Sequence, residues 1–365
     1  MACVARDRIV AGNRKRTLQS AACVGLAVII AALILTSASA AHATMITVDT
    51  LTDGSVAVHC TLRDAITAAN TMSAMNNCAG GTGSDTIVFS VTGTISLGST
   101  LPTVTDANLT ITGPISPGIK IDGGGLVQLM QVDARATLTL QFLTLANGRV
   151  TGASGGAGDG GAIFNQGTLT VTNSTFSANI TINSPDNVGG AIGGTASLKG
   201  TILAASFADN CAPFGVTDAG YNISDDDSCG FSAITSKNST VPKLAAGLAS
   251  NGGPTKTIAL QLGSPAIDAI PFATCTDASG NQLTTDQRGM PRPNPLDGSN
   301  GPCDIGAYEV QVEIFNAPPL MAANCHGKIV SALAQQFGAL DAATSALGFP
   351  SVKALQTDIR AFCGA

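Results

Sequence analysis

The chain of 365 residues is rich in glycine, with 42 Gly, and contains no Trp and only 2 Tyr. A predicted leader holds five of its 18 Lys and Arg and one of its 24 Asp and Glu, so 13 basic and 23 acidic residues remain and the net charge changes from −6 to −10. An acidic chain without a basic stripe argues against nucleic acid and anionic membrane surfaces as partners. The lack of Trp argues against an aromatic platform for stacking sugars.

Residues 1–43 have the parts of a signal peptide. The basic group Arg14-Lys15-Arg16 precedes a charge-free apolar run at 21–35, and Ala41-His42-Ala43 matches a small-residue cleavage signal. We predict cleavage between Ala43 and Thr44. Ala38-Ser39-Ala40 is a second possible cleavage signal, and the other alternative is an uncleaved signal anchor. The run is short for a span of about 20 residues. Elsewhere the sequence has no long apolar run, so we expect no transmembrane segment after cleavage.

Eight cysteines remain in the exported part of the chain, and an even number in such a chain predicts disulfides. We expect sequential pairing, because each pair brackets one loop-rich or helical segment. A zinc site is disfavoured, since the sequence has no Cys-x-x-Cys motif and only His59 and His326 remain after the leader. The predicted pairs are Cys60–Cys78, Cys211–Cys229, Cys275–Cys303 and Cys325–Cys363.

The segment 44–85 is expected to form an N-terminal cap. A strand-like run at 44–53 is followed by a helix that begins at Thr61, where Thr61-x-x-Asp64 is a capping pattern. Leu62, Ala65, Ile66 and Ala69 then fall on one helical face. A repeat structure needs such a cover over its exposed end.

Residues 86–262 are predicted to be stacked β repeats. Gly-Gly-Ala-Ile occurs at Gly160–Ile163 and again at Gly189–Ile192, and each copy is followed by Phe-x-x-Asn. Short runs between them alternate apolar residues with Thr, which is typical of strands with one buried face. A period of about 20–30 residues indicates a solenoid. Within it, 211–242 contains two Cys and is expected to leave the repeats as a disulfide-stapled side loop.

The C-terminal part contains three segments that differ in composition and in predicted structure. Residues 263–310 are rich in turns and Pro and are expected to close the β structure. A linker at 311–319 contains Pro318-Pro319. The segment 320–365 shows helical periodicity broken at Gly348-Phe349-Pro350, which predicts a helical hairpin.

Three groups of residues resemble known families. Cys60–Ile66 and Asp85–Ile87 resemble the CSLREA domain, with Thr61 and Asp64 in place of the family's Ser and Glu. The repeats are similar to those of polymorphic outer-membrane proteins and of pectate-lyase-like β-helices. Segments of 263–310 resemble the choice-of-anchor Q domain: Ser264–Asp268, Asp286–Pro293 and Cys303–Glu309.

This resemblance covers about 45–310 and implies an exported right-handed parallel β-helix, in the extracellular space or on the cell surface or envelope. We therefore predict an all-β fold of that kind, with an N-terminal capping helix and a C-terminal α-helical hairpin.

Asp225, Asp226 and Asp227 are the candidate site residues. They could bind Ca²⁺ through carboxylate oxygens, or act as an acid and base in glycoside cleavage. Adjacent side chains point in different directions, so a solvated loop is the simpler interpretation. No other cofactor is expected.

Other candidate groups have structural interpretations as well. Lys120, Arg135 and Arg149 could supply the base of a polysaccharide lyase, but no clustered Asp ligands accompany them. The loop from Asp277 to Arg288 departs from an EF-hand at its sixth and twelfth positions. We expect ion pairs among Arg288, Arg292, Asp304 and Glu309. We expect buried corner amides at Asn147, Asn165, Asn173 and Asn179.

Two functions from different classes follow. The first is a non-catalytic exported protein that presents an extended face for adhesion or binding, with a polysaccharide or a surface protein as partner. The alternative is a carbohydrate-active enzyme, a polysaccharide lyase or glycoside hydrolase. An acid cluster in one groove would favour the enzyme. A purely structural envelope component is a third interpretation.

Overall fold

In the computed structural model, all the described residues belong to one unit, Ala43–Ala365. The predicted signal peptide lies outside the described residues, apart from Ala43 at its cleavage site. The structure describes 43–362 apart from these gaps: 114–117, 152–159, 183–188, 208, 213–214, 246–248, 252–255, 262, 295–299, 312–324, 338, 347–348 and 350.

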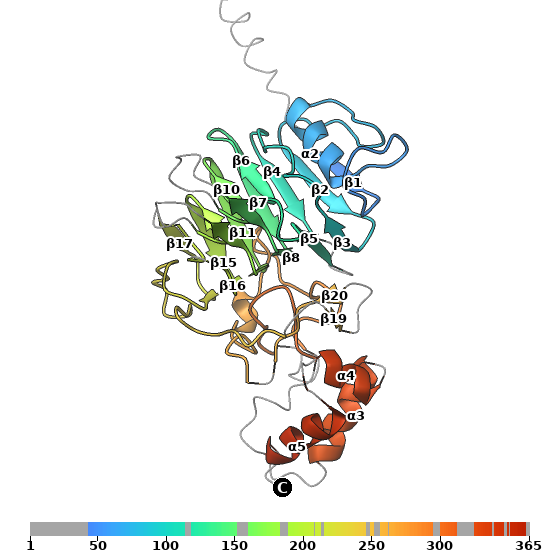
Figure 1. The fold of residues 1–365 in the computed structure, drawn as a ribbon, viewed down its shortest axis with the longest axis vertical. Coiled ribbons are helices and arrows are strands. Elements are labelled where there is room, and N and C mark those ends of the chain that lie inside the picture. Colours follow the sequence, from blue (N-terminus) through green and yellow to red (C-terminus); the bar gives the residue numbers. More distant parts are fainter. Residues whose placement is uncertain are drawn as a thin grey trace, which may run out of the picture. The chain divides into compact units, whose positions relative to one another are not determined.

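The described structure is mostly parallel β-sheet (Figure 1). The seven-stranded sheet contains, in spatial order, β1 (Thr44–Val48), β2 (Asp85–Phe89), β4 (Leu109–Thr112), β7 (Thr137–Gln141), β11 (Thr168–Thr172), β15 (Ala196–Lys199) and β17 (Val216–Asp218). The six-stranded sheet contains β3 (Gly93–Ser96), β5 (Ile119–Asp122), β8 (Leu143–Ala146), β12 (Thr175–Ser177), β16 (Ile202–Ala204) and β18 (Ile223–Ser224).

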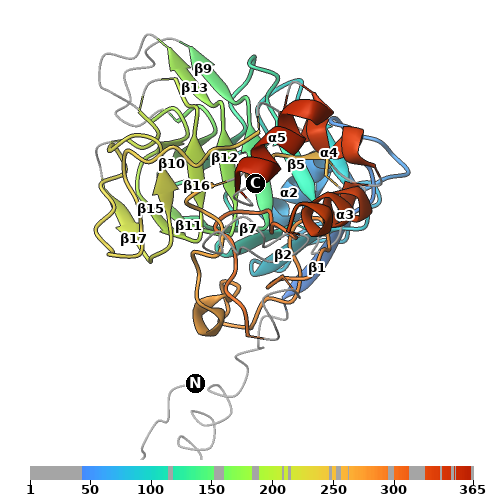
Figure 2. The same cartoon turned by 90° about the horizontal axis from the view of Figure 1, so that it is seen from below.

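Three smaller sheets complete the β structure. A three-stranded sheet contains β6 (Met130–Val132), β10 (Ile163–Asn165) and β14 (Ile192–Gly193). A short parallel pair contains β9 (Arg149–Thr151) and β13 (Ile180–Ile182) (Figure 2). The antiparallel pair is β19 (Ala249–Ser250) with β20 (Lys256–Thr257).

Successive strands of the chain belong to the parallel sheets in a repeating order, which explains the sequence repeat. β7, β8, β9 and β10 belong to the seven-, six-, two- and three-stranded sheets in turn, and β11 to β14 follow the same order. The two Gly-Gly-Ala-Ile copies meet on the three-stranded sheet, where Ile163 pairs with Ile192. Each copy of the motif therefore contributes the same strand of successive repeats.

The core is built by the strand alternation. In β11, Leu169 and Val171 are buried while Thr168 is exposed, because successive side chains leave a strand on opposite faces. Val171 lies in register with Leu140 on one side and Leu198 on the other, and all three are fully buried. Each such aliphatic side chain contributes about 1.5–3 kcal/mol on burial, so stacking stabilises strands too short to persist alone.

Both copies of the Gly-Gly motif are required by close backbone packing. A Cβ atom added to Gly160 would lie 2.0 Å from the carbonyl oxygen of Ile163, and one added to Gly189 would lie 2.1 Å from that of Ile192. The clashing atoms are backbone, which cannot move aside as the end of a flexible side chain can. The glycines are therefore needed for space and not for a left-handed backbone.

We expect Gly160→Ala to lower the free energy of unfolding by about 1–3 kcal/mol, the usual range for overpacking a tight site. Gly327→Ala is the matched control, because an added Cβ there meets nothing within 4 Å and alanine favours a helix. Chemical denaturation of both variants provides the measurement. Equal stability of the Gly160 variant and the wild type would contradict the packing argument.

Buried asparagines connect neighbouring repeats. Asn165, Asn173 and Asn179 are buried as expected, whereas Asn147 is half-buried and donates to the carboxylate of Asp122 at 2.9 Å. Asn179 is fully buried; its Oδ1 accepts from the backbone N–H of Gly148 at 2.8 Å, and its Nδ2 donates to the carbonyl of Leu145 at 3.1 Å. Asn222 makes the equivalent pair of bonds with Thr201 and Leu198. These amides satisfy backbone groups that the strand pairing leaves free.

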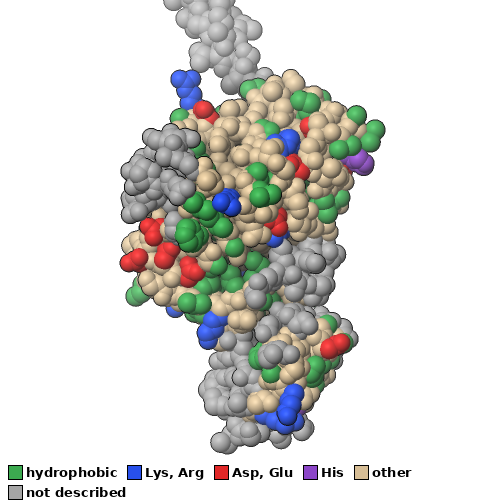
Figure 3. Space-filling model, viewed as in Figure 1, with side chains coloured by type: hydrophobic (Ala, Val, Ile, Leu, Met, Phe, Trp, Pro, Cys, Tyr) green, Lys and Arg blue, Asp and Glu red, His purple; other side chains and the backbone are tan. Residues whose placement is uncertain are grey.

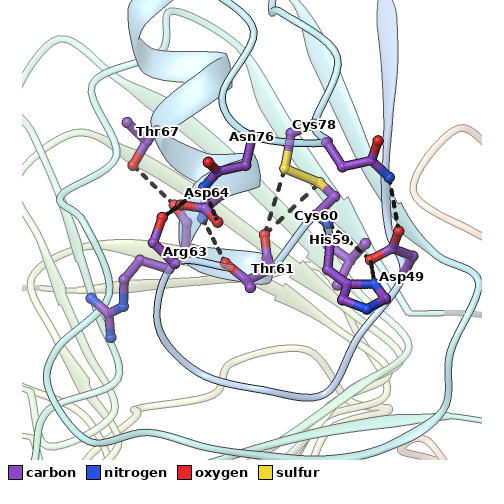
Figure 4. The surroundings of a disulfide bond; sticks show 12 residues. Asp49, His59, Cys60, Thr61, Arg63, Asp64, Thr67, Asn76 and Cys78 are labelled. Carbon is purple, nitrogen blue, oxygen red and sulfur yellow. Dashed lines mark hydrogen bonds and ion pairs between the residues drawn. A yellow bond between two sulfur atoms is a disulfide. The ribbon is translucent and has the colours of Figure 1, made fainter. Parts of the chain in front are cut away.

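The N-terminal helix α2 (Leu62–Thr71) contacts β1 and β2. The hydroxyl of Thr61 accepts from the N–H of Asp64 at 3.1 Å, so the predicted cap is formed. The carboxylate of Asp64 accepts from Ser55 at 2.6 Å and from Asn76 at 3.0 Å. Figure 4 shows Thr61, Asp64 and Asn76 beside the disulfide Cys60–Cys78, which fixes the start of the helix.

The expectation of a side loop at 211–242 is wrong. β17 and β18 pair in parallel with β15 and β16, so this segment adds strands to both large sheets. The disulfide Cys211–Cys229 lies within it, between residues that are both buried. Its composition resembles a loop because these strands have only three and two residues, too few for an alternating pattern to be visible.

The closure segment, 263–310, lies on the six-stranded sheet. Gln287 accepts from the hydroxyl of Thr144 at 3.0 Å and donates to the carbonyl of Ile119 at 2.8 Å. The N–H of Gly306 donates to Gly200 at 2.9 Å. The segment contains the 3-10 helix η1 (Phe272–Thr274) and the disulfide Cys275–Cys303. It covers the outer side of that sheet with its own apolar cluster, including Ile267, Ile270 and Ile305.

The C-terminal segment contains three helices where the sequence predicts a two-helix hairpin. They are α3 (Cys325–Phe337), α4 (Leu340–Ala346) and α5 (Val352–Phe362). Ile329, Leu333, Leu355 and Ile359 are buried, as their helical spacing predicts. The predicted Cys325–Cys363 bridge lies outside the described residues at Cys363. Within the described ranges, no helix is both long and apolar enough to span a bilayer.

Candidate functional site

The outward face of the seven-stranded sheet carries a row of hydroxyl side chains, one from each of six neighbouring strands. The strand register places them side by side. Neighbours in such a row are about 4.8 Å apart, the spacing of paired strands. We call this set the hydroxyl row: Thr86, Thr110, Thr139, Thr170, Ser197 and Thr217. All six side chains are half-buried or exposed.

A second polar line follows the hydroxyl row two residues further along the strands. Thr112, Gln141, Thr172 and Lys199 lie in register, and Gln141 donates to the hydroxyl of Thr112 at 3.0 Å. Lys199 is the one charged side chain of the two lines. The face is therefore regular, polar and almost uncharged.

The outer side of the six-stranded sheet is not available in the same way. Its outward side chains Lys120, Thr144 and Thr175 are buried, and the last two bond to the closure segment. The closure segment leaves the outer side of the seven-stranded sheet largely open, and the hydroxyl row occupies the outward positions there. This contrast singles out the seven-stranded sheet as the candidate binding face.

A pocket of about 250 Å³ lies beside Thr170 and Ser197 of the hydroxyl row, where the loop 276–280 reaches over the sheet. Lys199 Nζ donates to the hydroxyl of Thr276 at 2.6 Å, and Asn173 Nδ2 donates to the carbonyl of Thr276 at 3.0 Å. The N–H of Ala278 donates to Gln141 at 3.2 Å. Among the groups that line the pocket are Thr170, Thr172, Ser197, Lys199, Thr276 and Asp277.

The electrostatics of this pocket centre on Lys199 and Asp277. Burial lowers the pKa of the Lys199 ammonium, and the carboxylate of Asp277 partly opposes that shift. Asp277 itself accepts from the N–H groups of Ser279 and Asn281, which holds the tip of the loop. Hydroxyls, an ammonium and a carboxylate together can donate to and accept from the hydroxyl groups of a saccharide. Among the described lining residues Asp277 is the one carboxylate, so they offer no second acid for glycoside hydrolysis.

The three candidate aspartates lie elsewhere, after β18. Asp225 accepts from the N–H of Ala205 at 2.7 Å, and Asp226 from that of Asn210 at 2.7 Å. Asp226 also accepts from Ser224 and Ser228, while Asp227 is exposed. Two of the three carboxylates thus bond to backbone amides of the fold. Figure 3 shows acidic side chains gathered near β17. No group of three or more His, Cys, Asp or Glu in the described part of the chain could hold a metal ion.

The candidate lyase bases are not brought together. Lys120 on β5 forms an ion pair with Asp122 at 2.6 Å, and Arg149 lies on β9 in another sheet. Arg135 lies in the turn before β7.

The charged residues expected to lock the closure segment do form buried ion pairs. Arg292 lies 3.1 Å from Glu309, and Arg288 lies 2.7 Å from Asp286, which the sequence analysis did not include. All four side chains are fully buried. Burial raises the pKa of Asp304 to about 7, and burial together with the Asp304 charge raises the pKa of Glu309.

Sequence reasoning missed Lys199, and it considered the loop from Asp277 only as a calcium-binding loop. The signal available was the Thr-x-Thr spacing of the strands, which marks outward positions but does not show which face stays open. Comparisons with protein-family models, with curated proteins and with solved structures give no match to this chain.

Proposed function

We propose that this protein is an exported right-handed parallel β-helix that binds a polysaccharide on its seven-stranded sheet without cleaving it. The hydroxyl row carries the proposal: six in-register hydroxyls form a long, uncharged, hydrogen-bonding face. A neutral extended polymer of repeating hydroxyls complements such a face better than a charged partner does. The pocket with Lys199 and Asp277 is the site where one sugar unit would be held most tightly.

Three further observations support the proposal. The cyclic strand order and parallel pairing are consistent with a β-helix. The CSLREA-like segment lies at the β1 end of the seven-stranded sheet, the choice-of-anchor-Q-like segment packs on the six-stranded sheet, and both resemble segments of exported proteins. The three disulfides favour an oxidising compartment, outside the cell or at its surface or envelope.

A row variant tests the function. We expect Thr110→Val, Thr139→Val and Thr170→Val together to weaken polysaccharide binding about 100-fold, because each lost hydrogen bond is worth about 0.5–1.5 kcal/mol. Valine keeps the shape and favours strands, so the fold is retained. Thr284→Val, at an exposed position of the closure segment, is the matched control.

The assay uses oxidised protein 44–365 with neutral and acidic polysaccharides, with and without Ca²⁺, and scores both binding and new chain ends. Binding that the row variant loses and the control keeps supports the proposal. New chain ends that depend on Asp277 or on Asp225–Asp227 would establish the enzyme instead. Undiminished binding by the row variant would rule out this face, and binding to none of the polymers would favour a protein partner or a structural envelope role.

A further inference from the structure

Two buried carboxyl groups lie together where the described chain begins. Asp85 is the first residue of β2 and pairs in register with Thr44, the first residue of β1. Asp85 is 1% exposed and Asp106 is 4% exposed. Asp85 raises the pKa of Asp106 by a contact between the two carboxyl groups, although burial is the larger cause, and the pKa of Asp106 reaches about 6. We call this arrangement the acid pair.

The acid pair has several hydrogen-bond donors but no cation. Asp85 accepts from the N–H and hydroxyl of Thr82, from the N–H of Gly83 and from the N–H of Thr44 at 3.3 Å. Asp106 Oδ1 accepts from the N–H of Asn108 at 2.7 Å, while its Oδ2 is buried with no hydrogen-bond partner among the described groups. None of the ion pairs found among the described residues involves either side chain. Ionising two neighbouring buried carboxyls together is costly, and a positive charge beside them would lower that cost.

We propose that the acid pair is the binding site for the amino terminus that forms when a peptidase hydrolyses the Ala43–Thr44 bond. Water adds across that bond: the hydroxyl goes to the carbonyl carbon of Ala43 and a proton to the nitrogen of Thr44. The new amine takes a second proton from solvent and becomes an ammonium. It then forms an ion pair with Asp85, to which the amide of the uncut chain could offer only an uncharged donor.

The proposal requires cleavage at the Ala43–Thr44 bond, because only this cut makes the nitrogen of Thr44 the amino terminus. Ala43 is exposed, so the bond is at the surface, and Thr44 is the first residue paired with β2. A cut one residue earlier would leave an amide at Thr44 and place the ammonium beyond the paired strand. The inference goes beyond the proposed function, since it concerns maturation of the fold and holds whatever the sheet binds.

The test compares three forms of the oxidised protein: 44–365 with a free amine, the same chain acetylated at Thr44, and 43–365. We expect the free-amine form to melt about 3–5 °C above the other two, the shift given by an ion pair of ordinary strength in a domain of this size. We also expect its α-amine to react with an acylating reagent at least tenfold more slowly than in the unfolded chain. Mass spectrometry of the protein exported from the full chain should give Thr44 as its first residue.

Asp85→Asn provides the decisive variant, because asparagine keeps the size but removes the charge. In this variant the free and acetylated forms should melt together, while in the control Asp209→Asn, an exposed position, the difference should persist. If the Asp85 variant does not fold, amine protection in the wild type still decides the question. Equal melting of all three wild-type forms with a freely reactive amine, or a mature protein that begins elsewhere, would overturn the proposal.

Discussion

Arg292→Met should lower the free energy of unfolding by about 3–5 kcal/mol, the cost of leaving a buried charge without its partner. The Arg292 side chain is among the largest that are fully buried, and it pairs with Glu309 and donates to the carbonyls of Gly306 and Asp304. Methionine fills much of the same volume but leaves the Glu309 carboxylate and both carbonyls without these contacts. Urea denaturation followed by circular dichroism provides the measurement.

Arg360→Met is the control, since Arg360 is exposed on α5. Its loss should change stability by less than about 0.5 kcal/mol. Adding Glu309→Gln to Arg292→Met should restore part of the loss, because the unpaired charge is then removed. An Arg292 variant as stable as the control would show that the ion pair does not lock the closure segment.

Replacing Cys275 and Cys303 by Ala should lower stability by about 3–4 kcal/mol in the chain-entropy model and should also weaken polysaccharide binding. The bridge joins buried residues separated by 28 positions, and Cys275 precedes the loop whose Thr276 meets Lys199. Without the bridge, the loop is held to the sheet by the hydrogen bonds that join Thr276 to Asn173 and Lys199 and Ala278 to Gln141. We therefore expect the loop to move away from the sheet and the pocket to open. Hydrogen exchange at 276–283 and the binding assay together measure the effect.

The disulfide Cys60–Cys78 offers a matched control for that variant. Its loop spans 18 positions, so its removal should cost a similar free energy, about 3 kcal/mol, but it contains neither the pocket loop nor a member of the hydroxyl row. Binding retained without Cys60–Cys78 and lost without Cys275–Cys303 would assign the pocket to the loop. Loss of binding in both would show that the effect is one of general stability.

Local features of this fold follow from the sequence, because their causes are local. The cap at Thr61, the buried residues of β11 and the three sequential disulfides depend on neighbouring side chains or on short separations. The corner amides follow because an asparagine in a tight turn can bond backbone close to it. The segment 211–242 could not be assigned, since strands of two and three residues are specified by the strands they pair with and carry too few residues for a pattern.

Sequence patterns were enough to predict the β repeats, the N-terminal helix, three disulfide pairs and Arg288, Arg292 and Glu309 of the buried ion pairs, but not Asp286. The tertiary structure alone decided which face stays open, because that depends on where the closure segment packs. It alone brought Lys199 to Thr276, 77 residues apart in the chain, and it alone placed Thr44 beside the acid pair through the β1–β2 register. Contacts of this kind depend on which sheet faces are covered, and the periodicity of side chains along the sequence does not show which faces these are.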